Sequence, residues 1–133
     1  MVKDLPNVYR LKGIDNLTDI DICLTKALRQ LGSWQGPKRA CIEIISDVLL
    51  QHHAVTTRKW LSGLIQDLKS RGFTILAVIN PQTHPSEEAQ AVLSLFDGEI
   101  HVAEKETANG TTKTIKVIKL QGQKYSKDET ILL

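Results

Sequence analysis

The feature that most constrains the fold is the stretch Lys38–Pro81, in which two apolar runs flank an amphipathic segment. The runs cover residues 39–45 and 73–80, and each has the length of a strand. Between them, Thr57–Arg71 has the apolar periodicity of a helix, and Gly72 stands where a left-handed residue would end it. This pattern predicts a right-handed β-α-β crossover whose two parallel strands are buried on both faces. The periodic residues are Trp60, Leu61, Leu64, Ile65 and Leu68.

Strand and helix signals alternate on the amino-terminal side of this unit and continue after it. Residues 8–11 form a short strand candidate, and Asp15-Asn16 can cap a helix whose apolar stripe runs from Leu17 to Leu31. Pro85, followed by acidic residues, is typical of a helix start, and we expect this helix to end near Leu95.

The carboxyl-terminal third has the signals of a hairpin. Asn109-Gly110 is a turn signal between the strand candidates 99–103 and 112–120, and residues 130–133 are a candidate edge strand. The whole order predicts an α/β fold in three layers, with a mainly parallel sheet, helices on both faces and a C-terminal antiparallel hairpin.

The composition indicates one globular domain over residues 1–133. The apolar content is 41% and the charged content 24%, both ordinary values for folded proteins. The net charge of +2 is too mild to argue for nucleic acid by itself. Cys23 and Cys41 lack the spacing of metal ligands or of a disulfide framework, so we expect both to be buried thiols. The sequence has neither a signal peptide nor an apolar run of membrane length. We therefore expect a cytoplasmic protein.

Polar residues cluster where ligands bind in sheets of this type, at the carboxyl ends of the strands. Ser46 and Asp47 follow the first apolar run, and Asn80 and Gln82 follow the second. Glu43 interrupts the first run, where a carboxylate costs several kcal/mol unless it is paired, so it is either satisfied locally or kept for function.

In this order, the pieces resemble the second half of a RecA/KaiC-like ATPase core, as in the KaiC-like proteins of archaea. Residues 39–47 look like the Walker B strand, and residues 58–74 are similar to the next helix and strand. Residues 95–100 and 115–120 match the closing strand and the basic hairpin. The resemblance covers about residues 8–125. It implies a Walker B-like or sensor-like role in nucleotide or metal binding for Glu43, Ser46, Asp47, Asn80 and Gln82.

Two departures from the family pattern bear on catalysis. None of the eight glycines lies in a Walker A pattern, and too few residues precede Val8 to hold one. Lys12-Gly13 occupies the place of the catalytic glutamate, and Glu43 replaces the usual aspartate. We therefore expect a truncated, catalytically inactive domain without a cofactor, acting as a binding or regulatory module. The alternatives are a half-domain that uses ATP and magnesium once a partner supplies the P-loop, and a nucleic-acid-associated subunit related to RecA paralogs.

The missing P-loop strand also has a consequence for partners. In RecA-like sheets that strand lies between those matching residues 73–80 and 99–103, and this sequence has no segment for the place. We expect a homodimer or a hetero-oligomer with a related ATPase chain, and no membrane partner. Lysines along the hairpin fit edge protection, with a nucleic-acid surface as the alternative. They are Lys113, Lys116, Lys119, Lys124 and Lys127.

The histidines and tryptophans leave further alternatives open. His52, His53 and His84 could share a rim with Asp47 as metal ligands, but adjacent histidines seldom converge, and we expect no metal site. Trp34, on a predicted loop, is either half-buried against its own domain or a partner contact. Trp60 is expected to pack on the sheet.

Overall fold

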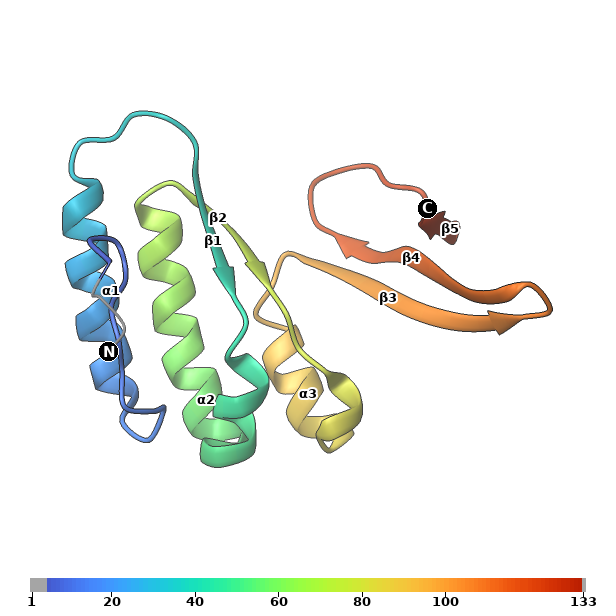
Figure 1. The fold of residues 1–133 in the computed structure, drawn as a ribbon, viewed down its shortest axis with the longest axis horizontal. Helices are drawn as coiled ribbons and strands as arrows, with labels where there is room; N and C mark the ends of the chain where they lie inside the picture. Colours follow the sequence, from blue (N-terminus) through green and yellow to red (C-terminus); the bar gives the residue numbers. More distant parts are fainter. Residues whose placement is uncertain (1–4, 133) are drawn as a thin grey trace. The chain divides into compact units, whose positions relative to one another are not determined.

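The computed structural model describes residues 5–132, and the chain divides into two compact units, residues 1–91 and 92–133 (Figure 1). The expectation of a single domain stays a prediction, and each unit is described by itself. The first unit contains α1 (Leu17–Leu31), β1 (Lys38–Ile42), α2 (Ile45–Ser70), β2 (Phe73–Ala77) and the 3₁₀ helix η1 (Pro81–Thr83). Helix α3 (Ser86–Leu93) crosses the boundary, and the second unit contains β3 (Gly98–Thr107), β4 (Gly110–Leu120) and β5 (Thr130–Leu132).

The β-α-β crossover predicted from the sequence is present in the first unit. Strands β1 and β2 pair in parallel, in a register from Lys38 opposite Phe73 to Ile42 opposite Ala77. Helix α2 joins them and packs against β2. Gly72 has φ 85°, the left-handed conformation that its place after the helix requires. The Lys38 ammonium donates to the Arg71 carbonyl at 3.1 Å, which fastens the start of β1 to the end of α2.

The core of this unit is carried by α2, which is longer than the sequence predicts. It begins at Ile45 rather than at Thr57, and it breaks at His53, where φ is 62° and ψ is 178°. The buried Thr57 hydroxyl donates to the Val48 carbonyl across the break, at 3.4 Å. Sequence periodicity misses the first part because the polar run at the break interrupts the apolar pattern. Side chains that are almost wholly buried lie on both sides of the break: Ile45, Val48, Leu49, Leu61 and Leu68.

Burial along the parallel strands alternates from residue to residue. The expectation that these strands are buried on both faces is therefore wrong for residues 38–42 and 73–77. The face that carries Ile75 is half-buried, whereas Leu76 and Val78 are 61% and 51% exposed. The run of β-branched and aliphatic residues did not reveal this, because one-sided and two-sided strands of this length have similar compositions.

Two smaller expectations for the first unit are also wrong. Residues 8–11 form no strand, and the Val8 amide instead closes a turn by donating to the Leu5 carbonyl. Cys41 is exposed on β1 rather than buried, while Cys23 on α1 is half-buried. Both cysteines are free thiols.

The second unit is a three-stranded antiparallel sheet in the order β3-β4-β5. The predicted hairpin is present, with its turn at Ala108-Asn109 and with Gly110, at φ 113°, as the first residue of β4. The register runs from Gly98 opposite Leu120 to Thr107 opposite Gly110, with an irregularity after Glu99. The predicted edge strand is present as β5, while Leu133 lies outside the described residues. A parallel sheet followed by a C-terminal antiparallel hairpin confirms the predicted α/β fold class.

None of the helices in the described part of the chain is both long and apolar enough to cross a membrane.

Candidate functional site

The carboxyl ends of β1 and β2 bring two of the predicted site residues into contact. Ser46 lies in the first turn of α2, directly after β1, and Asn80 lies just beyond β2. The backbone N–H of Asn80 donates to the Ser46 hydroxyl oxygen at 2.9 Å. The predicted convergence at this end of the sheet therefore occurs for these two residues, across a sequence separation of 34 positions.

His84 joins this contact, although sequence reasoning considered it only as one of several candidate metal ligands. Its Nε2 lies 3.0 Å from the Ser46 hydroxyl oxygen, and the residue is 8% exposed. Its Nδ1 is buried and has no hydrogen-bond partner among the described residues. A buried, unsatisfied imidazole nitrogen is rare and costs free energy, so this side chain is held in place by the surrounding fold. A sequence signal for it was the polar run at residues 80–84 directly after the second apolar run.

Asn80 also organises the turn that follows β2. Its side-chain oxygen accepts a hydrogen bond from the backbone N–H of Gln82 at 3.2 Å, and its backbone carbonyl accepts one from the Thr83 hydroxyl at 2.9 Å. Asn80 thus caps η1, which is the ordinary structural role of an asparagine before a helix. Gln82 makes its hydrogen bond to Asn80 with its backbone N–H, and the residue is exposed.

The two acidic candidates stand at the same end of the sheet without a partner. Glu43 and Asp47 are exposed, and neither makes a hydrogen bond or an ion pair with the described residues. Asp47 lies in the first turn of α2, where the helix dipole favours a negative charge. Ile44 precedes that turn and offers no side-chain cap. The expectation of a costly carboxylate inside an apolar strand is wrong for Glu43, because it follows β1 and faces solvent.

The other histidines are dispersed. His52 bonds the Ile14 carbonyl at 2.7 Å, and His53 lies 3.5 Å from a Glu88 carboxylate oxygen. Among residues 5–132, no three His, Cys, Asp or Glu side chains are grouped so that they could hold a metal ion.

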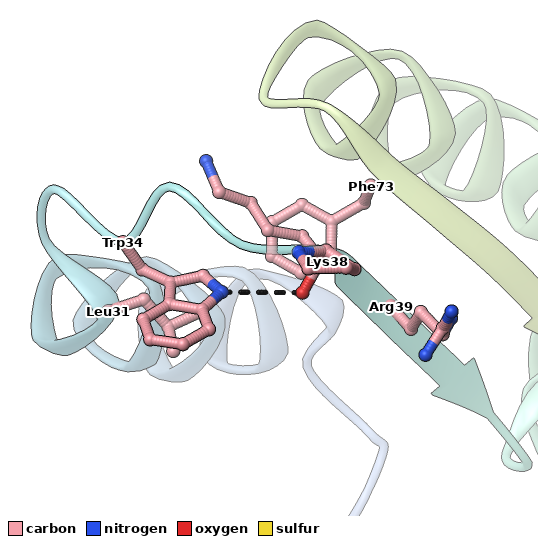
Figure 2. Close-up of a pocket in the computed structure, with 6 residues that line it drawn as sticks. Leu31, Trp34, Lys38, Arg39 and Phe73 are labelled. Atoms are coloured by element: carbon pink, nitrogen blue, oxygen red, sulfur yellow. Dashed lines mark hydrogen bonds between the residues drawn. The ribbon is translucent and has the colours of Figure 1, made fainter.

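Two concave surfaces lie elsewhere in the first unit. A cleft of about 180 Å³ surrounds the Trp34 indole (Figure 2). Trp34 is 57% exposed, its Nε1 donates to the Pro37 carbonyl at 3.3 Å, and the ring lies so close to Gly36 that a Cβ there would clash. A wider groove of about 470 Å³ separates α1 from α2. Trp60 lines it and donates from Nε1 to Asp21 on α1 at 3.0 Å, so this buried indole faces α1 as well as the core.

Glu43 and Asp47 contribute two exposed carboxylates to the rim at the strand ends. Carboxylate oxygens such as those of Glu43 and Asp47 suit Mg²⁺ and its water shell. A phosphate cradle requires glycine amides in a Walker A loop, and the glycines of this chain with positive φ occupy turns and helix ends instead. The residues present would therefore hold a metal-water shell only after another segment had bound the phosphates.

A parallel β-α-β unit followed by an antiparallel hairpin is the element order that the resemblance to a KaiC-like core predicts. The family model described as "ATPase: KaiC" matches residues 4–133. The chain therefore belongs to the KaiC ATPase family, which confirms the resemblance seen in its sequence.

A solved structure has the same fold. The chain is similar to a KaiC-like protein from the hyperthermophilic archaeon Pyrococcus horikoshii OT3, with a TM-score of 0.64 and 18% sequence identity. The match covers 87% of this chain and 50% of that protein, so the chain spans about half of its relative's length. At this identity the likeness concerns the fold alone. None of the curated proteins matches the chain.

Proposed function

We propose that this KaiC-family chain is a non-catalytic binding module whose open strand edges accept a strand from a partner chain. The observation that carries the proposal is the strand order. Strand β2 pairs only with β1 among the described strands, and β3 pairs only with β4. Each unit therefore presents an open strand edge, with a row of free backbone donors and acceptors.

Open edges of this kind are ready to accept another strand. Natural sheets protect them with charge, bulges or cover, because unpaired edges recruit other chains. In RecA-like cores the P-loop strand lies between the strands that correspond to β2 and β3. A P-loop-bearing KaiC-like chain is thus the partner that fits, and main-chain hydrogen bonds would supply the affinity, as in β-augmentation. Free thiols and the absence of a candidate membrane helix in the described chain are compatible with the cytoplasm, which stays part of this proposal.

The second candidate function is a nucleotide-binding half-domain, active once the partner supplies the P-loop. The unpaired carboxylates of Glu43 and Asp47 at the rim favour it. A nucleic-acid role for the hairpin has less support, because Lys105 and Lys113 pair with Glu129 and Glu104.

Calorimetry with ATP and Mg²⁺ separates these functions. The chain alone is expected to show neither micromolar binding nor turnover, because it has no phosphate cradle. Micromolar binding that is lost in Glu43→Ala would contradict the non-catalytic role. A matched control is Glu87→Ala, which removes an exposed carboxylate from α3.

The strand edges need a separate test. A peptide with the P-loop strand of a KaiC-like protein should slow amide exchange in β2 and β3, while a peptide with alternate residues replaced by proline should not. Unchanged exchange with both peptides would refute the strand-addition proposal.

A further inference from the structure

The outer face of the β1–β2 sheet has a charge pattern that strand addition does not use. Exposed residues along β1 and just beyond it are Arg39, Cys41 and Glu43, at alternate positions. Beside them on β2 lie Leu76 and Val78, which are 61% and 51% exposed. Within residues 5–91, this face has no cover, although parallel sheets are normally covered on both faces. An exposed apolar face with charged ends is a candidate interaction surface.

The two charges on this face stand at opposite ends of one strand. Arg39 is near the amino end of β1, Glu43 lies just past its carboxyl end, and Cys41 is midway. At about 3.3 Å per residue, the two charged residues are about 13 Å apart along the strand. Neither makes a hydrogen bond or an ion pair with the described residues. Arg39 also lines the Trp34 cleft, and Figure 2 shows its side chain extending away from the indole.

We propose that the occupant of this face is a second copy of the same chain, related by a two-fold axis that passes the Cys41–Leu76 pair. Such an axis places β1 antiparallel to β1 of the second copy, and an isologous interface makes every contact twice. Arg39 then faces Glu43 of the second copy, and Glu43 faces Arg39 of the second copy.

The register of the sheet extends this match to β2. Cys41 and Leu76 are direct neighbours across the β1–β2 ladder, so both lie at the axis and each meets its own counterpart. Val78 meets Thr74 of the second copy, which is also exposed. The apolar centre becomes buried and the charges are paired at its two ends, at the sheet spacing of about 10 Å.

The charge pattern favours a second copy over a partner of uniform charge. A basic partner would leave Arg39 facing a like charge, and an acidic partner would do the same to Glu43. Only an antiparallel partner with the opposite order of charges satisfies both, and the chain itself has that order. The strand edges of β2 and β3 stay free in this arrangement, so the inference stands independently of the proposed function.

Sedimentation of charge-reversal variants tests the inference. The wild-type chain should sediment as a dimer of the 14.8 kDa chain at micromolar concentration. Arg39→Glu and Glu43→Arg should each weaken the dimer by more than about tenfold in Kd, because like charges then face each other twice. An equimolar mixture of the two variants should restore a dimer, since each Glu at position 39 then faces an Arg at position 43. Lys69→Glu is the control for a charge change away from this face.

Thiol cross-linking tests the same interface in a chain that keeps the wild-type charges at positions 39 and 43. In a Cys23→Ser background, a short bismaleimide should link Cys41 to Cys41 of the second copy and give a covalent dimer, whereas Cys41→Ser should give none. A wild type that stays monomeric throughout the micromolar range would overturn the inference. So would a failure of the mixed variants to recover the dimer, or a dimer whose Cys41 thiols are not linked.

Discussion

The two units of this chain differ in how their apolar residues are used. In the first unit, α2 places Ile45, Leu49 and Leu61 in a core where each is at most 1% exposed. In the second unit, Val102 on β3 and Ile131 on β5 remain 65% and 62% exposed. Helix α2 lies against β2 and carries its own core, whereas the antiparallel sheet has hydrogen-bonded ladders but little burial. The difference shows that regular backbone pairing does not by itself provide a core, and we expect the stability of the chain to rest on α2.

The largest effect is expected from removing a large side chain of the α2 core. Trp60→Ala should lower the free energy of unfolding by about 3–5 kcal/mol, because it leaves a cavity and removes the hydrogen bond to Asp21. Trp34→Ala is the matched control, and with its indole 57% exposed it should cost far less. Urea unfolding followed by far-UV circular dichroism measures both variants. Equal losses in the two would mean that α2 does not carry the core.

A smaller effect is expected at the break in α2. His53 has φ 62° and ψ 178°, a conformation that glycine adopts with much less strain than other residues. His53→Gly should therefore be more stable than His53→Ala by about 1 kcal/mol. Both variants lose the contact between His53, whose side chain is 75% exposed, and Glu88, so the comparison isolates the backbone. Thermal unfolding measures the stability of both variants. If His53→Gly were less stable than His53→Ala, the backbone at position 53 would not be strained.

The smallest effect concerns the surface of the second unit. The hydrogen bond from Lys105, followed by that from Thr114, lowers the pKa of Glu129. A lowered folded-state pKa means that this pair stabilises the fold above the unfolded-state value and that the contribution is lost as the pH falls through the folded-state value. Lys105→Met should raise the Glu129 pKa toward 4.5 with little change in stability.

Side-chain NMR can follow the Glu129 titration directly. Lys113→Met is the control, because the Lys113 ammonium lies 3.8 Å from Glu104 rather than near Glu129. An unchanged Glu129 titration in Lys105→Met would contradict the assigned cause.

The sequence predicted those features that depend on local pattern. The crossover, the helix capped by Asn16, the Asn109-Gly110 hairpin and the edge strand at Thr130 all occur, because caps, glycine turns and apolar periods act over a few residues. The first part of α2 was missed, since its break at His53 is stabilised by Thr57, which is buried by tertiary packing.

The candidate site was predictable in part for the same reason. The convergence of strand ends in α/β sheets predicts that Ser46 and Asn80 lie close together, and the two residues are hydrogen-bonded to each other. The contact of His84 depends on how η1 folds back after β2, and the exposure of Glu43 depends on where β1 ends. Both are decided by a residue or two at element boundaries, where sequence patterns are least informative.

Native-state hydrogen exchange of the dilute chain tests most directly the claim that α2 carries the stability while the antiparallel sheet is weakly protected. The slowest amides should lie in α2 between Leu61 and Leu68 and exchange only through global unfolding. Amides of β3 near Val102 should exchange through local opening at a much lower free energy. If the amides of β3 and β4 were as strongly protected as those of α2, the second unit would have a core of its own. That result would contradict the claim that α2 carries the stability of the chain.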